Sequence, residues 1–394
     1  MNLGNLLVLA NSFPDSTDTF YSGMFIKEQL KALSKYFNQV FVISPVPKSF
    51  GLTLKDKVCK NYEINNKIKV FFPRFFHIPI SYFRKKLGYT FFKVVDKVIQ
   101  ENNLSFDFVY AHFTWPPGFA GSILKDKYNV PLIIQAHGYD IYGLPFTNQF
   151  WYERVRNTLN TANYVITVSH KNAEYIKRLK IATPFEVIPN GFDKNLFKTL
   201  PKEDCRKKLG LPLDKKVIVT VGNLVKQKGH KYLFEAISEI VKRRKDILCV
   251  VIGDGPEKKN LLKQISLYKI QNFIKLVGRK KHTELPVWLN AADLFVMPSL
   301  VEGNPTVIFE ALGTGLPVVG TRVGGIPEII RSDEYGLIVE PANSEDLVQK
   351  ITFAIDSQWN RKKIVNFAQQ FSWNVIAEKI YKIFEKSYNQ AKCN

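Results

Sequence analysis

The stretch "PSLVEGNPTVIFEALGTGLPVVG", residues 298–320, carries two glutamates around a turn. The apolar residues before it, Leu294–Met297, have the length and composition of a buried strand. Glu302 lies in the loop that follows, and Glu310 lies inside the helix predicted after that loop. Strand, loop and helix in this order form the repeating step of parallel α/β sheets, whose ligands bind beyond the carboxyl ends of the strands.

The predicted helix start is suited to an anion. Pro305 fits the first helical position, with Asn304 as the N-cap. Free N–H groups and the helix dipole bind phosphate there. Glutamates on both sides would repel an anion unless they accept hydrogen bonds from sugar hydroxyls. A ribose, a diphosphate and a hexose in line would fit. These residues alone leave open that Glu302 only faces the helix dipole and that Glu310 lies at the surface.

Outward from this stretch, strand-length apolar runs alternate with helical patterns in two sets, separated by a polar, Lys-rich seam. This alternation predicts an α/β protein with two Rossmann-like, doubly wound domains that face each other across a cleft. We expect one domain over 1–195 and a second domain over 196–370. Residues 371–394 have the pattern of an amphipathic helix, which we expect to cross back to the first domain.

Composition limits the classes of function. The chain has 394 residues and a net charge of +21, with four cysteines in no paired spacing. No apolar run reaches the ~18 residues of a spanning helix, and the N-terminus lacks the basic region of a signal peptide. We therefore expect a cytoplasmic protein with free thiols. The charge predicts a polyanionic partner, either a membrane, a nucleic acid or a phosphorylated substrate. The alternative is a basic surface that serves only solubility.

One basic segment also contains many aromatic residues. Residues 48–97 hold 12 basic and 3 acidic side chains, and nine Phe and Tyr residues are interspersed over 67–98. Such a mixture suits the interface of an anionic membrane, so we expect peripheral attachment to the inner face of the cell membrane. The alternative is that the aromatic residues form core and the lysines a solvated face.

Several motifs in order make the sequence recognisable. It resembles the retaining GT-B glycosyltransferases of family 4, the group 1 type, over nearly its whole length. The Glu302/Glu310 pair stands in register with the two-glutamate signature of that family. The other motifs are "IPNGFD" (188–193), "VGNLVKQKGHKYLFEAI" (221–237), "VIGDGP" (251–256) and "GGIPEII" (324–330).

The resemblance implies a role for each matching residue. Glu302 would face the hydroxyls of the donor sugar, Glu310 would bind the ribose, and Lys228 would neutralise the departing diphosphate. The remaining donor residues implied are Gly222 beside the phosphates, Gly278 and Arg279 around the base, and the amides near Gly303, Asn304 and Thr306. The family often has an arginine where this chain has Asn223. Either Lys226 then supplies that positive charge to the diphosphate, or Lys228 and the helix dipole are enough to stabilise it.

In the first domain, His137 follows a predicted strand in "IIQAHGYDIYG" (133–143) and would lie near the donor sugar. We expect Asp140 to brace that loop, and His112 to end another strand at the same edge. Gly23 resembles the N-terminal glycine that admits acceptor or phosphate. Candidates for acceptor contacts are Gly23, His112 and Asp140, and further ones are Asp15, Ser16 and Asp18. The resemblance implies that the domain over 1–195 binds the acceptor and that the domain over 196–370 binds the nucleotide sugar.

The resemblance implies transfer of a sugar from a UDP- or GDP-sugar to a glycan or lipid-linked acceptor in cell-envelope polysaccharide or glycoconjugate synthesis. Retention by front-face attack would need no protein nucleophile. No Asp-x-Asp triplet occurs, so we expect neither a required metal nor a cofactor. The alternative enzyme is a GT-B sugar-nucleotide 2-epimerase. A phosphorylase would need a lysine-bound pyridoxal phosphate, and no nucleic-acid motif supports a basic nucleic-acid-binding protein.

Overall fold

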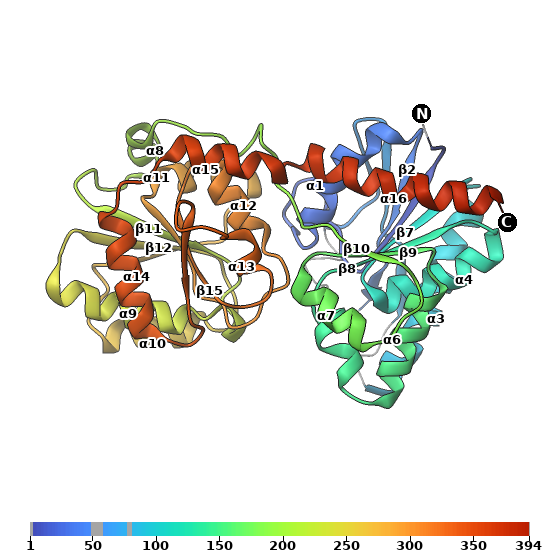
Figure 1. The fold of residues 1–394 in the computed structure, drawn as a ribbon, viewed down its shortest axis with the longest axis horizontal. Helices are drawn as coiled ribbons and strands as arrows, with labels where there is room; N and C mark the ends of the chain where they lie inside the picture. The colour runs from blue at the N-terminus through green and yellow to red at the C-terminus, as the bar shows by residue number, and fades with distance from the viewer. Residues whose placement is uncertain (1–2, 49–57, 77–80, 394) are drawn as a thin grey trace. The chain divides into compact units, whose positions relative to one another are not determined.

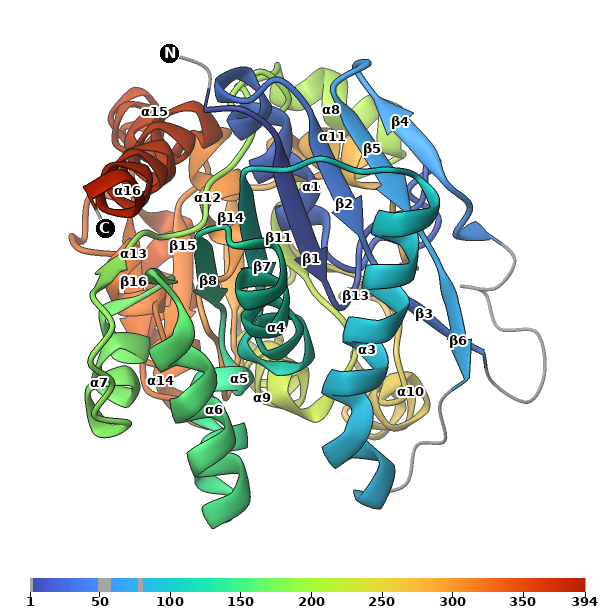
Figure 2. The same ribbon diagram turned by 90° about the vertical axis from the view of Figure 1, so that its right-hand side faces the viewer.

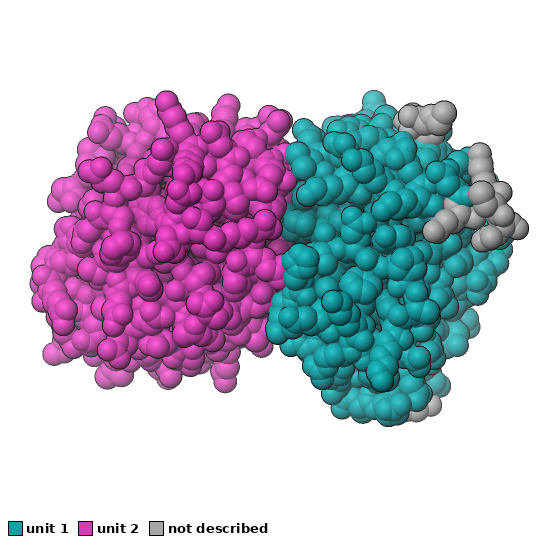
Figure 3. Space-filling model, in the orientation of Figure 1, with its two compact units in different colours: residues 1–190, 373–394 teal, residues 191–372 magenta. Residues whose placement is uncertain are grey.

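The computed structural model describes residues 3–48, 58–76 and 81–393 of the chain. The chain divides into two compact units, which Figure 3 colours separately. Unit 1 comprises Met1–Asn190 together with Trp373–Asn394, and unit 2 comprises Gly191–Ser372. The chain therefore leaves unit 1, builds unit 2 and returns to unit 1 with its last helix.

Unit 1 contains an eight-stranded sheet in the order β10-β9-β8-β7-β1-β2-β5-β4, part of which faces the viewer in Figure 2. All neighbours are parallel except β4 and β5. A separate parallel pair joins β3 to β6. The strands are β1 (Leu6–Ala10), β2 (Val40–Ile43), β3 (Val46–Lys48), β4 (Tyr62–Ile64), β5 (Ile68–Phe71), β6 (Arg74–Phe76), β7 (Phe108–His112), β8 (Leu132–Ala136), β9 (Tyr164–Thr167) and β10 (Phe185–Val187).

Helices cover both faces of this sheet. Successive side chains of a strand point to opposite faces, so Leu6 and Val8 of β1 pack with α1 and α16, whereas Leu7 and Leu9 pack with α3, α4 and α6. The helices are α1 (Met24–Leu33), α3 (Ser81–Glu101), α4 (Phe119–Tyr128), α5 (Tyr139–Tyr142), α6 (Gln149–Thr161), α7 (His170–Arg178) and α16 (Trp373–Cys393), with short helical turns η1 (Ser34–Tyr36), η2 (Thr114–Gly118) and η3 (Leu144–Phe146).

Unit 2 contains a six-stranded, wholly parallel sheet in the order β13-β12-β11-β14-β15-β16. Strands β11, β12 and β15 of this sheet are labelled in Figure 1. This is the 3-2-1-4-5-6 order of a Rossmann fold, which reverses between β11 and β14. The strands are β11 (Lys216–Val221), β12 (Ile247–Ile252), β13 (Ile274–Gly278), β14 (Leu294–Met297), β15 (Val318–Thr321) and β16 (Gly336–Val339). The predicted fold class is confirmed for each unit.

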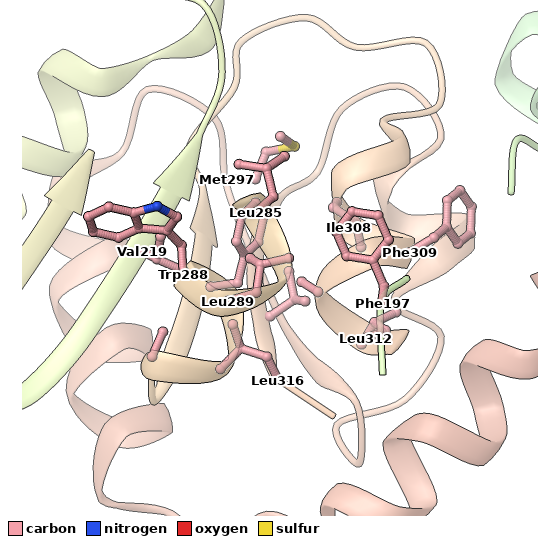
Figure 4. Close-up of a cluster of buried hydrophobic side chains, with 14 of the residues drawn as sticks. Phe197, Val219, Leu285, Trp288, Leu289, Met297, Ile308, Phe309, Leu312 and Leu316 are labelled. Carbon is pink, nitrogen blue, oxygen red and sulfur yellow. The ribbon is translucent and has the colours of Figure 1, made fainter. Parts of the chain in front are cut away.

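The core of unit 2 also has two layers. Figure 4 shows one of them, in which Ile308 and Leu312 of α12 lie with Phe197 in the cluster that also holds Trp288. Helices α9, α10 and α14 cover the other face. The helices are α8 (Lys202–Leu209), α9 (His230–Arg243), α10 (Lys258–Leu267), α11 (Leu285–Ala291), α12 (Thr306–Gly313), α13 (Ile326–Ile329), α14 (Ser344–Asp356) and α15 (Arg361–Ala368), with turns η4 (Lys226–Lys228), η5 (His282–Glu284) and η6 (Gln369–Phe371).

The basic segment over 48–97 is largely structural. Its described part forms β4, β5, β6 and most of α3, and Phe72, Phe75 and Phe91 are buried. Phe76 and Tyr89 are exposed, at 62% and 52%. Part of the segment, residues 49–57 and 77–80, lies outside the described residues.

Candidate active site

The reversal of strand order places two loops side by side in unit 2. Strands β11 and β14 are hydrogen-bonded neighbours, so the residues that follow them emerge at one edge of the sheet. These are residues 222–229 after β11 and 298–305 after β14, and they include most of the predicted donor-binding residues. Open α/β sheets bind their ligands at this point.

The loop after β14 is held by the loop after β11. The N–H of Leu300 donates to the carbonyl of Gln227 at 2.7 Å. Gly229 has φ +64, and a Cβ there would lie 1.9 Å from the carbonyl oxygen of Pro298. Only glycine fits at this contact, because a side chain would collide with backbone.

The "GGIPE" motif holds the same loop from its other side. The N–H of Gly325 donates to the carbonyl of Gly303 at 2.7 Å. A Cβ at Gly324, where φ is +52, would lie 2.0 Å from the carbonyl oxygen of Glu302. The backbone that carries Glu302 is therefore fixed between two glycine contacts.

The side chain of Glu302 has two partners. Its Oε1 accepts hydrogen bonds from Nζ of Lys228 at 2.6 Å and from Oγ of Ser299 at 2.7 Å. The side chains of Lys228 and Glu302 are 26% and 10% exposed. The sequence assigned these two residues to different parts of the donor, whereas the structure brings them into contact. Lys226, the alternative phosphate-binding lysine, is exposed.

Helix α12 begins one residue later than the sequence predicted. Pro305 occupies the N-cap position in an extended conformation, with φ −73 and ψ 115, and no side chain caps the helix. The prediction of Asn304 as N-cap was therefore wrong, because the extended Pro305 starts the helix at Thr306. Asn304 is buried just before it. The N–H of Ile308 donates to the carbonyl of Pro305 at 3.2 Å. The N–H groups of the residues before Ile308 precede this first helical hydrogen bond, as at any helix start.

Glu310 lies in the second turn of α12 and is buried. Its Oε1 is 2.8 Å from Nε2 of His282 in η5. Each glutamate of the pair thus meets a side chain that can donate a hydrogen bond. The sequence analysis missed His282, although its position shortly after β13 places it at the same edge of the sheet as the other loops.

The remaining predicted donor residues follow β11 and β13. A Cβ at Gly253, where φ is +153, would lie 1.8 Å from the carbonyl oxygen of Gly222, and the N–H of Gly253 donates to the carbonyl of Gly278 at 3.0 Å. The "VIGDGP" motif therefore holds the loops after β11 and β13 together. Asn223 and Arg279 are exposed on these loops.

In unit 1, β7 ends at His112 and His137 follows β8. Nδ1 of His112 and Nε2 of His137 lie 3.0 Å apart, so one ring donates a hydrogen bond to the other. Burial lowers the pKa of His137 to about 3. Burial, and then His137, lower the pKa of His112 well below its ordinary value. Both rings are therefore neutral near pH 7. Phe25 and Phe113 flank His137, with ring centroids 4.8 and 4.7 Å away.

Asp140 braces the loop that carries His137. Its Oδ1 accepts from the backbone N–H groups of His137 and Gly138 at 3.1 and 2.8 Å, and its Oδ2 accepts from that of Thr114 at 3.0 Å. Burial raises the pKa of Asp140, and these backbone hydrogen bonds lower it. The carboxylate of Asp140 therefore accepts its hydrogen bonds from the backbone of unit 1.

The loop after β1 carries the predicted acceptor residues. Gly23 is the N-cap of α1 with φ +87, and a Cβ there would lie 2.3 Å from the carbonyl oxygen of Ser12. Asp15 is buried and accepts from the N–H of Phe20 at 2.7 Å, and Asp18 pairs with Lys27 at 2.6 Å. Ser16 is exposed. Asp15 and Asp18 therefore have partners inside unit 1.

Within residues 3–48, 58–76 and 81–393, no three His, Cys, Asp or Glu side chains lie together as ligands for a metal ion. None of the helices there combines the length and the apolarity that crossing a bilayer requires.

Known proteins resemble both units. The family described as Glycosyltransferase Family 4 matches residues 23–196, and the family described as Glycosyl transferases group 1 matches residues 201–371. A putative teichuronic acid biosynthesis glycosyltransferase, TuaC of Bacillus subtilis, is 31% identical over 84% of both chains. Sucrose-phosphate synthase of Thermosynechococcus elongatus aligns with a TM-score of 0.82 at 19% identity, over 98% of this chain and 100% of that one. HepE of Anabaena, solved with UDP-glucose, aligns at 0.73 with 22% identity, over 97% and 99%.

Proposed function

The chain belongs to the glycosyltransferases of group 1 and family 4, with the GT-B fold, and we propose that it transfers a sugar from a UDP- or GDP-sugar to a glycan or lipid-linked acceptor. The observation that carries the proposal is the placement of Glu302 and Glu310 on either side of the α12 N-terminus. Glu302 lies within hydrogen-bond distance of Lys228, and Glu310 within hydrogen-bond distance of His282. The relative named for teichuronic acid biosynthesis supports an envelope polysaccharide as acceptor. The structure solved with UDP-glucose supports a nucleotide-sugar donor.

The donor is proposed to lie along the edge formed by the loops after β11, β13 and β14. The ribose binds Glu310, the base meets the backbone near Gly278 and Arg279, and the diphosphate binds at the N-terminus of α12. Gly303, Asn304 and Thr306 supply the N–H groups there. This order assigns the sugar to Glu302.

Lys228 exchanges partners in this proposal. In the structure it is paired with Glu302. A diphosphate carries more negative charge than a carboxylate, so it attracts Lys228 more strongly. The carboxylate of Glu302, still anchored by Ser299, then accepts hydrogen bonds from the sugar hydroxyls. One movement of a lysine thereby prepares both the leaving group and the sugar site.

The proposed transfer retains the anomeric configuration. The acceptor oxygen attacks the anomeric carbon on the face that the diphosphate leaves, and its proton passes to the departing diphosphate. The protein contributes orientation and positive charge near the leaving group, from Lys228 and the α12 N-terminus. We propose that neither metal nor cofactor takes part, so activity is expected to survive EDTA.

The first test measures donor binding. Thermal shifts with a panel of UDP- and GDP-sugars are expected to identify the donor. Glu310→Ala is expected to weaken binding of the matching nucleotide by about 10- to 100-fold, because a charged acceptor of ribose is lost. Glu340→Ala, at an exposed glutamate paired with Arg322, is the control. Unchanged nucleotide affinity in Glu310→Ala would remove the assignment. Analysis of products for a 2-epimer tests the alternative enzyme.

We propose that the acceptor lies in an anionic membrane, with the protein attached at the cytoplasmic face. The supporting residues are on α3, where Arg84, Lys85 and Lys86 are exposed close to exposed Tyr89. Arg84 and Lys85 lie over the rings of Trp151 and Phe150, at 5.5 and 4.5 Å. Each basic side chain near an anionic leaflet is worth about 1 kcal/mol.

Co-sedimentation with vesicles tests this attachment. We expect binding to phosphatidylglycerol-containing vesicles at low salt, and loss of binding in Arg84/Lys85/Lys86→Glu. Lys242/Arg243/Lys245→Glu makes the same change of charge in unit 2 and is expected to retain more binding. Equal loss in both variants would point to overall charge instead of α3, and binding to neutral vesicles alone would exclude the attachment.

A further inference from the structure

His282 and Glu310 form a nearly buried pair that the proposed donor site does not by itself require. Nε2 of His282 lies 2.8 Å from Oε1 of Glu310, and the two side chains are 14% and 7% exposed. A carboxylate only accepts hydrogen bonds, so the proton of this bond resides on Nε2. One oxygen of Glu310 is therefore held by the protein itself.

His282 is itself held from two sides. The turn η5 closes on itself, because the N–H of Lys281 donates to Oε2 of Glu284 and the N–H of Glu284 donates to the carbonyl of Lys281, both at 2.9 Å. The ring of His282 packs against Phe197 with centroids 5.1 Å apart. Phe197 is fully buried and shares a core cluster with Ile308 of α12 (Figure 4). Helix α12 and the histidine are thus fixed to the same core.

We propose that His282 is a positioning residue that makes the site require a ribonucleotide. This inference rests on the proposed assignment of Glu310 to the ribose. A carboxylate offers about four lone-pair sites, so Oε1 and Oε2 can still accept both the 2′-OH and the 3′-OH while His282 occupies one site.

The selectivity follows from the anchor. A glutamate that is free to change rotamer can reorient toward the 3′-OH of a 2′-deoxyribose and keep its oxygens hydrogen-bonded. A glutamate fixed by His282 cannot turn, so a ligand that lacks the 2′-OH leaves a buried acceptor without its donor. Leaving a buried polar group unpaired is costly, and sites built this way reject the ligand that lacks the group.

The test compares ribo- and deoxyribonucleotides by calorimetry. Binding of UDP and 2′-deoxy-UDP is measured for the wild type, His282→Ala, His282→Gln, His282→Phe and Glu310→Ala, with GDP and 2′-deoxy-GDP in parallel. Glutamine keeps an N–H donor near the position of Nε2. Phenylalanine keeps the ring against Phe197 but cannot donate, so it separates the hydrogen bond from packing.

We expect the wild type to prefer the ribonucleotide by about tenfold or more. His282→Ala and His282→Phe are expected to lose most of that preference, mainly through weaker UDP or GDP binding, and His282→Gln to recover much of it. A collapse of the preference in Glu310→Ala alone, with all His282 variants like the wild type, would overturn the role of His282 and leave the donor site intact. Absence of any ribonucleotide preference in the wild type would overturn both.

Discussion

Lys228 acts on two neighbours through its charge. It pairs with Glu302, and it helps burial to lower the pKa of His230 to about 4. Burial is the larger cause, because His230, the first residue of α9, is only 3% exposed. One partly exposed lysine therefore connects the carboxylate of Glu302 with His230, the first residue of the following helix.

Lys228→Ala is expected to lower kcat by about 100-fold or more, because positive charge near the departing diphosphate acts mainly in the transition state. Lys226→Ala, two residues earlier and exposed, is the matched control and is expected to retain near-normal kcat. Steady-state kinetics with the identified donor measures both. Equal effects of the two substitutions, or normal kcat in Lys228→Ala, would place the phosphate site elsewhere.

Stability is expected to fall in mild acid. The pKa of His230 is about 4 in the folded chain, below its ordinary value of 6.5. Between these two pH values the imidazole is therefore protonated in the unfolded chain and neutral in the folded chain. Its contribution is present above pH 6.5 and is lost as the pH falls towards 4. The loss is about 2 kcal/mol at pH 5. His137, with a pKa of about 3, adds a loss of the same sign.

Urea unfolding at pH 7 and pH 5 measures this effect. In His230→Gln the difference in unfolding free energy between the two pH values is expected to shrink by about 2 kcal/mol relative to wild type. His170→Gln, at an exposed residue that starts α7, is the comparison variant. A pH dependence that is identical in the wild type and His230→Gln would show that His230 titrates normally.

At the scale of elements, the buried strands could be predicted from the sequence, whereas the short strands β3 to β6 of unit 1 could not. The bounds of β14 match the predicted Leu294–Met297, because strands covered on both faces are continuous apolar runs. Strands β3 to β6 were missed, since they are only three or four residues long among lysines that indicated a membrane surface. The His282–Glu310 pair could not be predicted either, because it joins residues 28 positions apart through rotamers fixed by packing.

The glycine contacts around the Glu302 loop can be tested with a matched pair. Gly229 and Gly210 both have positive φ, at +64 and +60, so alanine costs both about 1 kcal/mol of backbone strain. Only Gly229 faces backbone, since nothing lies within 4 Å of a Cβ at Gly210. Gly229→Ala is therefore expected to lower donor affinity and kcat together, and Gly210→Ala to lower only the melting temperature slightly. Similar kinetics in both would exclude the steric role.

For the whole molecule, α16 is part of the core of unit 1 although it follows unit 2 in sequence. Phe384 packs edge-on against Phe37 and Phe108, at 5.2 and 5.4 Å between centroids, and is fully buried. Trp373 and Ile380 lie in the same cluster. Unit 1 is therefore incomplete without the last helix.

Phe384→Ala is expected to destabilise unit 1 by about 3–5 kcal/mol, because a large cavity opens in its core. Phe353→Ala, at a phenylalanine of α14 that is 63% exposed, is expected to change stability by less than about 0.5 kcal/mol. Urea unfolding followed by far-UV circular dichroism measures both variants. A small effect of Phe384→Ala would mean that α16 only rests on unit 1.

The return of the chain with α16 has a consequence for biosynthesis. On the ribosome, the first 190 residues emerge before the helix that covers one face of their sheet. Unit 2, about 180 residues long, is translated in between, which takes roughly 10–40 s at ~5–20 residues per second. Throughout that interval α16 is absent from Phe37, Phe108 and their neighbours, so the nascent chain exposes an apolar surface that can aggregate. Chaperones that shield nascent chains would meet it there, while unit 2 can already complete its fold.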